Sequence, residues 1–368
     1  MSMEASTLNE GVALRNALND ASRGPDINGA ERNVTELPPP AKLLHMMIGY
    51  WISQSVYVAA KLGIADLLRD GPRTSEELAA ACQAHAAALY RLLRTLASLG
   101  VFTEVDARRF ALTPLAEWLR TDHPGSMRAL AIMYGEEQYR AWGHVLSSIQ
   151  TGAPAFEQRF GVSYFQYLAD HPESAATFNA AMTGYAAQVA SGVVAADDFS
   201  HSRTVVDVGG GQGTLLATML AANPHLHGIL FDLPQVTADA APLLTAAGVA
   251  ARCQTIAGDF FAAVPSGGDV YILAHILHDW DDARGRTILQ NCRAAMVPTG
   301  RILIVDMVVP PGNAPSDSKL ADLHMLVLFN SRERTEVEFR DLLASAGLRL
   351  TRALSTASGP SIVEAVIA

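Results

Sequence analysis

The sequence predicts an α/β protein in which a doubly wound domain, with a mainly parallel seven-stranded sheet, follows a smaller helical domain of winged-helix shape. Two observations support this prediction. From Thr204 onward, short apolar runs alternate with helix-length segments, which is typical of a parallel sheet covered by helices on both faces. Before that point nearly every segment has a helical pattern. The length of 368 residues also fits about two domains, at roughly 100–200 residues each.

The composition is apolar and acidic. Hydrophobic residues make up 49% of the chain and charged residues 17%, with a formal net charge of −10. An acidic chain repels the phosphates of nucleic acids, so we expect no nucleic-acid partner. The three cysteines (Cys82, Cys253 and Cys292) form no closely spaced pair. This argues against a disulfide framework and a zinc site, and it favours a cytoplasmic protein without a metal.

The first hundred residues open with two different segments. Residues 1–40 are polar and rich in turn-forming residues, and we expect a flexible arm with no secretion signal. Between Lys42 and Lys61 there are 18 residues without a charge, which is near the length of a membrane span. Polar residues interrupt the run and no second span follows. We therefore expect a helix buried in a subunit interface, most simply of a dimer, and no membrane partner.

Residues 41–120 have the pattern of a winged-helix-like module. Helices are predicted over residues 61–71, 75–81 and 86–99, and strands over 101–105 and 108–113. The second of these helices opens at Thr74 and Glu77 with a capping-box pattern. Such a module either binds DNA or serves as a packing domain. Eight basic and seven acidic residues between Lys61 and Arg120 leave almost no net charge, which favours packing.

The remaining chain divides into two predicted regions. Residues 121–195 are expected to be a helical linker that lines the substrate pocket, and residues 196–368 the doubly wound domain. Strands are predicted over 204–208, 227–233, 251–260, 269–274 and 300–309, with two more in 349–368. Sheets of this kind bind ligands at the carboxyl ends of their strands.

Three of these strand ends carry residues suited to a nucleoside. The sequence from Val205 to Gly213 runs from a buried strand into a glycine-rich turn, with a spacing that matches neither a dinucleotide fingerprint nor a P-loop. Asp232 ends the next strand, where an acid can accept both ribose hydroxyls. Asp259 and Phe260 lie at the end of the third strand. There an acid can hydrogen-bond the edge of an adenine, and an aromatic ring can cover its face. No basic residue is present to meet phosphates, which favours a cationic ligand, S-adenosylmethionine.

The fourth strand leads into two histidines and a set of acids. His275 and His278 follow the strand end, where the reactive group of a bound ligand is expected, and a neutral imidazole can take a proton near pH 7. A capping or core histidine is the alternative. His275, His278 and Asp279 are also residue types that bind metals. No further motif with recognisable ligand spacing accompanies them, so we expect no metal.

Five motifs together resemble a known family: VVDVGGGQGTLL, FDLP, GDFF, LHDWDD and RERTEVEF. In order and spacing they are similar to the S-adenosylmethionine-dependent small-molecule O-methyltransferases, the caffeate/hydroxyindole O-methyltransferase-like family that includes bacterial natural-product tailoring enzymes. The resemblance covers about residues 41–368. It implies a Rossmann-like methyltransferase domain, a first domain that forms a homodimer, and methyl transfer to a hydroxyl of an aromatic or polyketide-like small molecule.

The resemblance also implies roles for individual residues. The expected catalytic residues are His278, as general base, with Asp306 and Glu333 orienting it. The expected cofactor-binding residues are Asp207, Gly209, Gly211, Gly213, Asp232, Leu233, Asp259, Phe260, Ala274, His275 and Asp279. The expected substrate-binding residues, chosen mainly because acceptor pockets are apolar, are Met133, Phe160, Phe165, Asn179, Met182, Met325, Phe329 and Asn330.

The chain departs from the family pattern at two positions, and alternatives remain. Ala274 stands where many relatives have Lys or Arg, and Asp306 where plant members often have Glu. Glu333 could instead form a surface ion pair, and Asp306 could cap its strand. A relative that binds S-adenosylmethionine but performs hydroxylation or a pericyclic step is the main alternative function, and a winged-helix regulator that senses a ligand is another. The complete set of His278, Asp306 and Glu333 favours methyl transfer.

Overall fold

A computed structural model describes residues 37–368. The chain forms two compact units, which divide between His123 and Pro124. The flexible arm expected over residues 1–40 lies outside the described residues except for its end, where Pro39 already begins a helix. Within residues 37–368, no helix combines the length and the apolar character needed to cross a membrane.

The first unit is a helical module with a small sheet. Its helices are α2 (Pro39–Met47), α3 (Gly49–Lys61), α4 (Ile64–Leu67), α5 (Ser75–Ala81), α6 (Ala86–Ser98) and α7 (Pro114–Glu117), and its strands are β1 (Arg73–Thr74), β2 (Phe102–Asp106) and β3 (Arg109–Leu112). The predicted capping box is present, because Thr74 and Glu77 each accept a hydrogen bond from the other's backbone N–H. Strand β1 adds to the predicted hairpin, which gives a sheet of order β1-β3-β2.

The apolar segment between Lys42 and Lys61 forms two helices, so the prediction of a single helix is wrong. The chain breaks at Ile48, before Gly49, because glycine costs about 1 kcal/mol relative to alanine inside a helix. Only Ala59 and Ala60 of these two helices are buried within the protomer. The exposed large side chains, here called the α2–α3 apolar surface, are Leu43, Met46, Met47, Tyr50, Trp51 and Ile52.

The second unit begins with helices and continues as an α/β domain. The helices before the sheet are α8 (Arg128–Gly135), α9 (Glu137–Trp142), α10 (Val145–Thr151), α11 (Ala155–Phe160), α12 (Tyr164–Asp170) and α13 (Pro172–Ala196). The strands are β4 (Thr204–Val208), β5 (His227–Asp232), β6 (Cys253–Ala257), β7 (Val270–Ala274), β8 (Arg301–Asp306), β9 (Leu348–Ser355) and β10 (Ser361–Ile367). All seven predicted strands are therefore confirmed, in the order β6-β5-β4-β7-β8-β10-β9, with β10 antiparallel to both neighbours.

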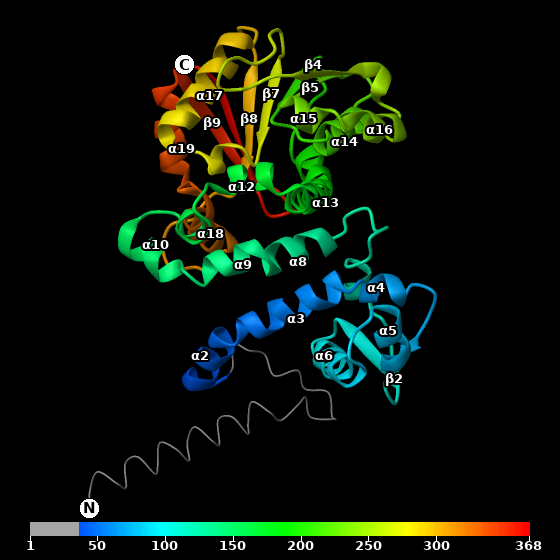
Figure 1. The fold of residues 1–368 in the computed structure, drawn as a ribbon. Coiled ribbons are helices and arrows are strands. Elements are labelled where there is room, and N and C mark those ends of the chain that lie inside the picture. The colour runs from blue at the N-terminus through cyan, green and yellow to red at the C-terminus, as the bar shows by residue number, and fades with distance from the viewer. Residues whose placement is uncertain (1–36) are drawn as a thin grey trace, which may run out of the picture. The chain divides into compact units, whose positions relative to one another are not determined.

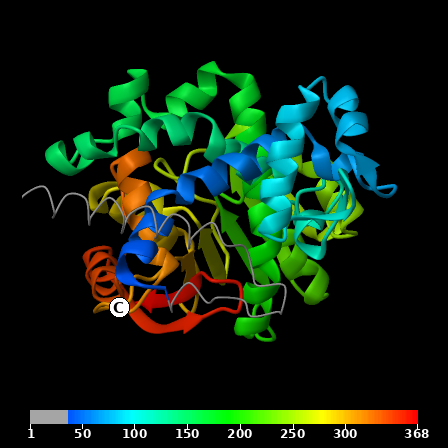
Figure 2. The ribbon, with the colours of Figure 1, turned by 90° about the horizontal axis from the view of Figure 1, so that it is seen from below.

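Helices cover both faces of this sheet. On one face lie α14 (Thr214–Ala222), α15 (Pro234–Thr237) and α16 (Ala240–Ala246), and on the other α17 (Asp282–Ala295) and α19 (Glu336–Ser345) (Figure 1). Side chains alternate between the faces, since Val205 joins one core and Val206 the other. Two 3₁₀ turns, η2 (Ala250–Arg252) and η3 (Leu277–Asp279), and helix α18 (Asp317–Phe329) complete the unit. Helix α18, orange in Figure 2, contacts η3.

Candidate active site

The loop after β4 makes a tight turn that only glycine readily adopts. Gly209, Gly211 and Gly213 have φ values of +73°, +60° and +85°, all in the left-handed region. A Cβ at Gly209 would collide with Ile276, whereas a Cβ at Gly211 would meet nothing within 4 Å. The turn is thus packed against protein at Gly209 and open at Gly211, where a ligand can approach the backbone.

Asp232, at the end of β5, is held beside this turn. Its Oδ2 accepts a hydrogen bond of 2.8 Å from the N–H of Gly211, and its Oδ1 accepts one of 2.7 Å from Leu233. Asp207 lies beneath the turn and is 1% exposed. Burial, together with the charge of Asp232, raises the pKa of Asp207 to about 7. Asp207 therefore supports the turn from below, while Asp232 lies at its edge.

The loop after β6 brings an acid and aromatic rings to the same edge of the sheet. Asp259 is exposed and its Oδ1 accepts a hydrogen bond of 2.8 Å from the N–H of Phe261. The ring of Phe260 packs against Phe261 and Trp280, at centroid distances of 4.9 Å and 6.1 Å. Phe260 also lies next to Gly209, so the glycine turn and the aromatic ring are neighbours.

The segment after β7 places His278 among carboxylates. Its Nδ1 is 2.8 Å from Oε1 of Glu333, and its Nε2 is 3.6 Å from Oδ1 of Asp279. The ring centroid of His275 is 5.3 Å from that of His278, and Nδ1 of His275 is 4.0 Å from Oδ1 of Asp306. Glu333 is 4% exposed and is paired with the imidazole, so it is not a surface ion-pair residue.

These surroundings push the protonation of the two histidines in opposite directions. Burial alone lowers the pKa of His278, but Asp279, Asp306 and Glu333 outweigh it and raise the pKa to about 10. Burial raises the pKa of Asp306 to about 8 and that of Asp279 to about 6. Burial also lowers the pKa of His275 to about 3, helped by the charge of His278. At neutral pH His278 and Asp306 therefore both favour the protonated form, whereas His275 is neutral.

Several buried polar atoms of this cluster have no hydrogen-bond partner within residues 37–368. They are both carboxylate oxygens of Asp306, Oε2 of Glu333 and Nε2 of His275. Buried polar groups are nearly always bonded to protein, water or a ligand. The unpaired atoms thus mark the place where water or a polar ligand group completes the site.

The same cluster contains a set of metal-ligand types that the sequence did not group. One atom from each of His275, His278 and Asp306 lies within 4.8 Å of the others. However, His275 Nδ1 is 4.0 Å from Asp306 Oδ1, whereas tetrahedral zinc ligands at about 2.0 Å from the metal lie roughly 3.3 Å apart. One nitrogen of His278 is also taken by Glu333. The set is too wide for zinc, and we assign no metal to it.

Arg334 fixes the backbone that carries His278. The side chain is 1% exposed and donates hydrogen bonds to the carbonyls of Leu277 (2.7 Å) and Trp280 (2.8 Å) and to Oδ1 of Asp282 (2.9 Å). Its neighbour Glu333 holds the His278 ring. Two consecutive residues thus orient both the side chain and the backbone of the candidate base. The sequence showed Arg334 only as a possible ion-pair partner.

The residues expected to bind substrate fall into three groups. Met133 and Met325 are buried, Phe160, Phe165, Met182 and Phe329 pack in apolar clusters, and Asn179 and Asn330 are exposed. Phe165 stacks on Trp280 at a centroid distance of 6.0 Å, which links the aromatic cluster to the His278 segment. Trp280 lies inside the LHDWDD motif but was given no role, and Tyr185, whose ring is 5.0 Å from that of His275, was missed because no motif marks it.

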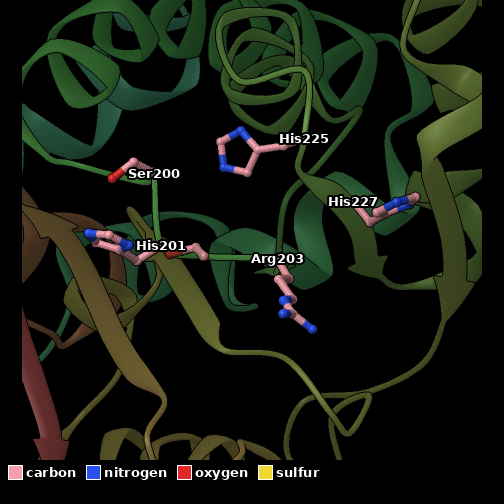
Figure 3. Close-up of a pocket in the computed structure, with 6 residues that line it drawn as sticks. Ser200, His201, Arg203, His225 and His227 are labelled. Atoms are coloured by element: carbon pink, nitrogen blue, oxygen red, sulfur yellow. The ribbon is translucent and has the colours of Figure 1, made fainter.

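Two surface hollows lie in the second unit. One, of about 510 Å³, is lined by Ser200, His201, Ser202, Arg203, His225 and His227. It lies at the amino ends of β4 and β5, opposite the glycine turn, and its labelled side chains do not converge on one point (Figure 3). The other is lined by Asp281, Asp282, Asp322, Leu323, Leu326, Asn330, Ser331 and Arg332. Neither includes a residue of the His278 cluster.

Comparison with known proteins identifies the family. A family model described as an O-methyltransferase domain matches residues 142–349, and one described as an O-methyltransferase dimerisation domain matches residues 44–122. The chain belongs to this O-methyltransferase family. It is 56% identical to the phenazine O-methyltransferase PhzM of Lysobacter antibioticus, over 89% of this chain and 96% of that protein. It is also 33% identical to a phenazine-1-carboxylate N-methyltransferase of Pseudomonas aeruginosa, over 87% of this chain and 95% of that one.

Solved structures agree with this assignment. The structure of LaPhzM matches with a TM-score of 0.87 at 55% identity and covers 90% of this chain and 100% of that one. The O-methyltransferase NcsB1 of neocarzinostatin biosynthesis, in complex with S-adenosylmethionine and 2-hydroxy-5-methyl naphthoic acid, matches with a TM-score of 0.73 at 35% identity, over 86% of this chain and 96% of that one. The predicted fold class, a mainly parallel seven-stranded methyltransferase sheet after a dimerisation domain, is confirmed.

The hydrogen bonds by which Arg334 fixes the backbone around His278, here called the Arg334 clamp, can be tested with a matched pair of substitutions. Arg334→Met is expected to lower kcat for methyl transfer by about 10- to 100-fold, because small displacements of a catalytic group are costly. It is also expected to lower the thermal unfolding midpoint, since two backbone carbonyls, one of them buried, lose their donor. Arg332→Met is the control, because Arg332 also reaches Asp282 but is 46% exposed. Equal effects of the two substitutions would contradict the clamp.

Proposed function

We propose that this protein transfers the methyl group of S-adenosylmethionine to a hydroxyl of an aromatic or polyketide-like small molecule, with His278 as the general base. The observation that carries the proposal is the 2.8 Å hydrogen bond between Nδ1 of His278 and Glu333, at the edge of the sheet that also holds the glycine turn. This arrangement leaves Nε2 of His278 as the nitrogen that exchanges a proton.

The residues at this edge fit the cofactor. Bound S-adenosylmethionine supplies an electrophilic methyl group on a cationic sulfur. The open backbone at Gly211 allows the methionine part to pass, the carboxylate of Asp232 accepts ribose hydroxyls, and Asp259 with Phe260 holds adenine. The turn carries no basic side chain for phosphates. The acids Asp232, Asp279 and Asp306 suit a ligand with a positive charge.

His278 removes the proton that prevents a hydroxyl from attacking. Nε2 takes this proton while Nδ1 remains bonded to Glu333, which fixes the tautomer and strengthens the base. Without ligands the surrounding carboxylates keep His278 protonated. A cation bound nearby lowers the pKa of His278 by repulsion, which increases the unprotonated fraction of His278 in the loaded site. The leaving sulfide needs no proton, and one base is enough.

The presence of a supported base distinguishes methyl transfer to a hydroxyl from the alternative functions. An aromatic ring nitrogen, the kind of atom implied by the name of the N-methyltransferase relative, has a lone pair ready to attack and needs no base. A hydroxyl requires a base, and in this protein the buried carboxylate of Glu333 supports His278 in that role. The same set favours methyl transfer over hydroxylation or a pericyclic step. A panel of phenols with labelled S-adenosylmethionine, analysed by mass, would identify an O-methyl product.

His278→Ala tests the base directly. Turnover is expected to fall by about 10²- to 10⁴-fold, the usual contribution of a general base, while the affinity for S-adenosylmethionine measured by calorimetry stays within a few-fold. His227→Ala is the control, because His227 lies at the opposite edge of the sheet. Unchanged turnover in His278→Ala would remove the role, and a parallel loss of cofactor binding would point to a structural role.

Glu333→Gln tests the electrostatics. In the native protein the rate should rise with pH through the pKa of His278, which the carboxylates hold above its ordinary value. Removing one negative charge lowers that pKa, so the acidic limb of the kcat/KM profile should move to lower pH by about one unit, while kcat falls. Glu336→Gln, in an exposed ion pair with Arg340, should leave the profile in place. An unmoved limb in Glu333→Gln would be evidence against the proposed base.

We also propose that two copies of the chain pair through the α2–α3 apolar surface. The dimerisation model matches residues 44–122, and α2 and α3 expose large apolar side chains, among them Met46 (77%) and Trp51 (55%). Contiguous apolar surface of this kind marks an interface.

A charge introduced on this surface should separate the copies. Met47→Glu with Trp51→Glu is expected to convert a dimer to a monomer in light scattering after size exclusion, because two buried carboxylates oppose association. Val105→Glu is the control, since Val105 is 53% exposed on the hairpin of the same unit. A double variant that remains dimeric would locate the interface elsewhere.

A further inference from the structure

A second histidine near the candidate base has its hydrogen-bonding direction fixed by a tryptophan. The indole Nε1–H of Trp142, in α9, donates a hydrogen bond of 2.8 Å to Nδ1 of His324, in α18. An indole N–H can only donate, so Nδ1 of His324 must carry a lone pair. A neutral imidazole with a lone pair on Nδ1 has its proton on Nε2. Trp142 therefore makes Nε2–H of His324 a donor.

His324 is also kept neutral. Burial lowers the pKa of His324 to about 4, with a further contribution from the charge of His278. Protonation would place a second N–H against the indole N–H, which is an additional reason for the neutral form. The Nε2–H group thus keeps one orientation and one role through the neutral pH range.

His324 lies near the segment that carries the candidate base. Helix α18 contacts η3, which carries His278, and the two imidazoles are within electrostatic reach of each other. The ring of His324 lies between Trp142 and the ring of Tyr134, which it meets at 90° and 5.6 Å. Within residues 37–368, Nε2 has no hydrogen-bond partner and is not sealed from solvent. A lone fixed donor in aromatic surroundings is a typical specificity element.

We propose that His324 is a specificity-determining residue whose Nε2–H donates a hydrogen bond to an acceptor atom, a ring nitrogen or a ring carbonyl oxygen, in the aromatic system that carries the methylated hydroxyl. This inference rests on the proposed function and narrows its substrate class to aromatic hydroxyl compounds with a built-in hydrogen-bond acceptor. A substrate without that atom displaces water from the donor and leaves it unpaired, and sites of this type discriminate strongly against such a substrate.

Three acceptors of nearly the same shape test the inference. 1-Hydroxyphenazine offers ring nitrogens, 1-hydroxyanthraquinone offers carbonyls, and 1-hydroxyanthracene offers neither. Their dissociation constants are measured by calorimetry on the full chain with saturating S-adenosylhomocysteine. The native protein is expected to bind at least one of the first two about tenfold or more tightly than 1-hydroxyanthracene. Which of the two is preferred distinguishes a ring nitrogen from a carbonyl. Equal binding of all three would overturn the proposal.

Substitutions at the two residues complete the test. His324→Phe should abolish the preference by weakening the preferred ligand and leaving 1-hydroxyanthracene unchanged, whereas His324→Gln, which keeps an N–H at a similar reach, should retain part of it. Trp142→Phe should give an intermediate preference, because the imidazole is no longer held in one tautomer. A preference that survives in His324→Phe would also overturn the proposal.

The outcome is separable from that of the proposed function. Binding in the presence of S-adenosylhomocysteine requires no methyl transfer, so the preference can be present even if no hydroxyl is methylated. Conversely, methyl transfer to 1-hydroxyanthracene as efficient as to the other two would support the proposed function and refute the role of His324.

Discussion

The candidate active site depends on one constraint: a protonatable imidazole has to be held among three carboxylates, those of Glu333, Asp279 and Asp306, while it is hydrogen-bonded to only one of them within residues 37–368. In this described part of the chain, Glu333 is the hydrogen-bond partner of His278, at 2.8 Å, whereas Asp279 stays at 3.6 Å. Arg334, the next residue, does not neutralise Glu333, because the guanidinium of Arg334 is hydrogen-bonded to Asp282 and to two backbone carbonyls. The cluster therefore keeps a negative balance, which raises the pKa of His278 and suits a cationic ligand.

The sheet supplies the frame for this cluster. Strand β8 ends at Asp306, and the chain leaves β7 at His275, whose φ of +56° is unusual for a residue other than glycine. The N–H of His275 is bonded to the carbonyl of Val305, at 3.0 Å, so this sharp exit is tied to the neighbouring strand. The following turn η3 then brings His278 beside Glu333. The strained exit and the Arg334 clamp act on the two ends of the same short segment, which explains how a loop residue can be placed as firmly as one in a strand.

Much of the frame could be predicted from sequence, and less of the site. The strands were recognisable because most are short apolar runs separated by helix-length segments, and the capping box at Thr74 is a local pattern. The break at Ile48 was missed because the continuous apolar character of the segment predicted one helix, although glycine at position 49 is unfavourable inside a helix. Strand-end residues such as Asp232 could be found because all carboxyl ends of parallel strands share one edge. Arg334 and His324 could not, because their partners, Leu277 and Trp142, are 57 and 182 residues away in the chain.

The three histidines near this edge show that surroundings, and not residue type, assign chemical roles. Carboxylates raise the pKa of His278, while burial lowers the pKa values of His275 and His324 and keeps them neutral. Glu333 sets the proton exchange of His278, and Trp142 sets the donor direction of His324. Because the two controls act through different neighbours, removing the Glu333 charge should change the pH dependence of the rate, whereas loosening Trp142 should change which substrate binds. Chemistry and recognition are thus separable in a site where both depend on the same kind of ring.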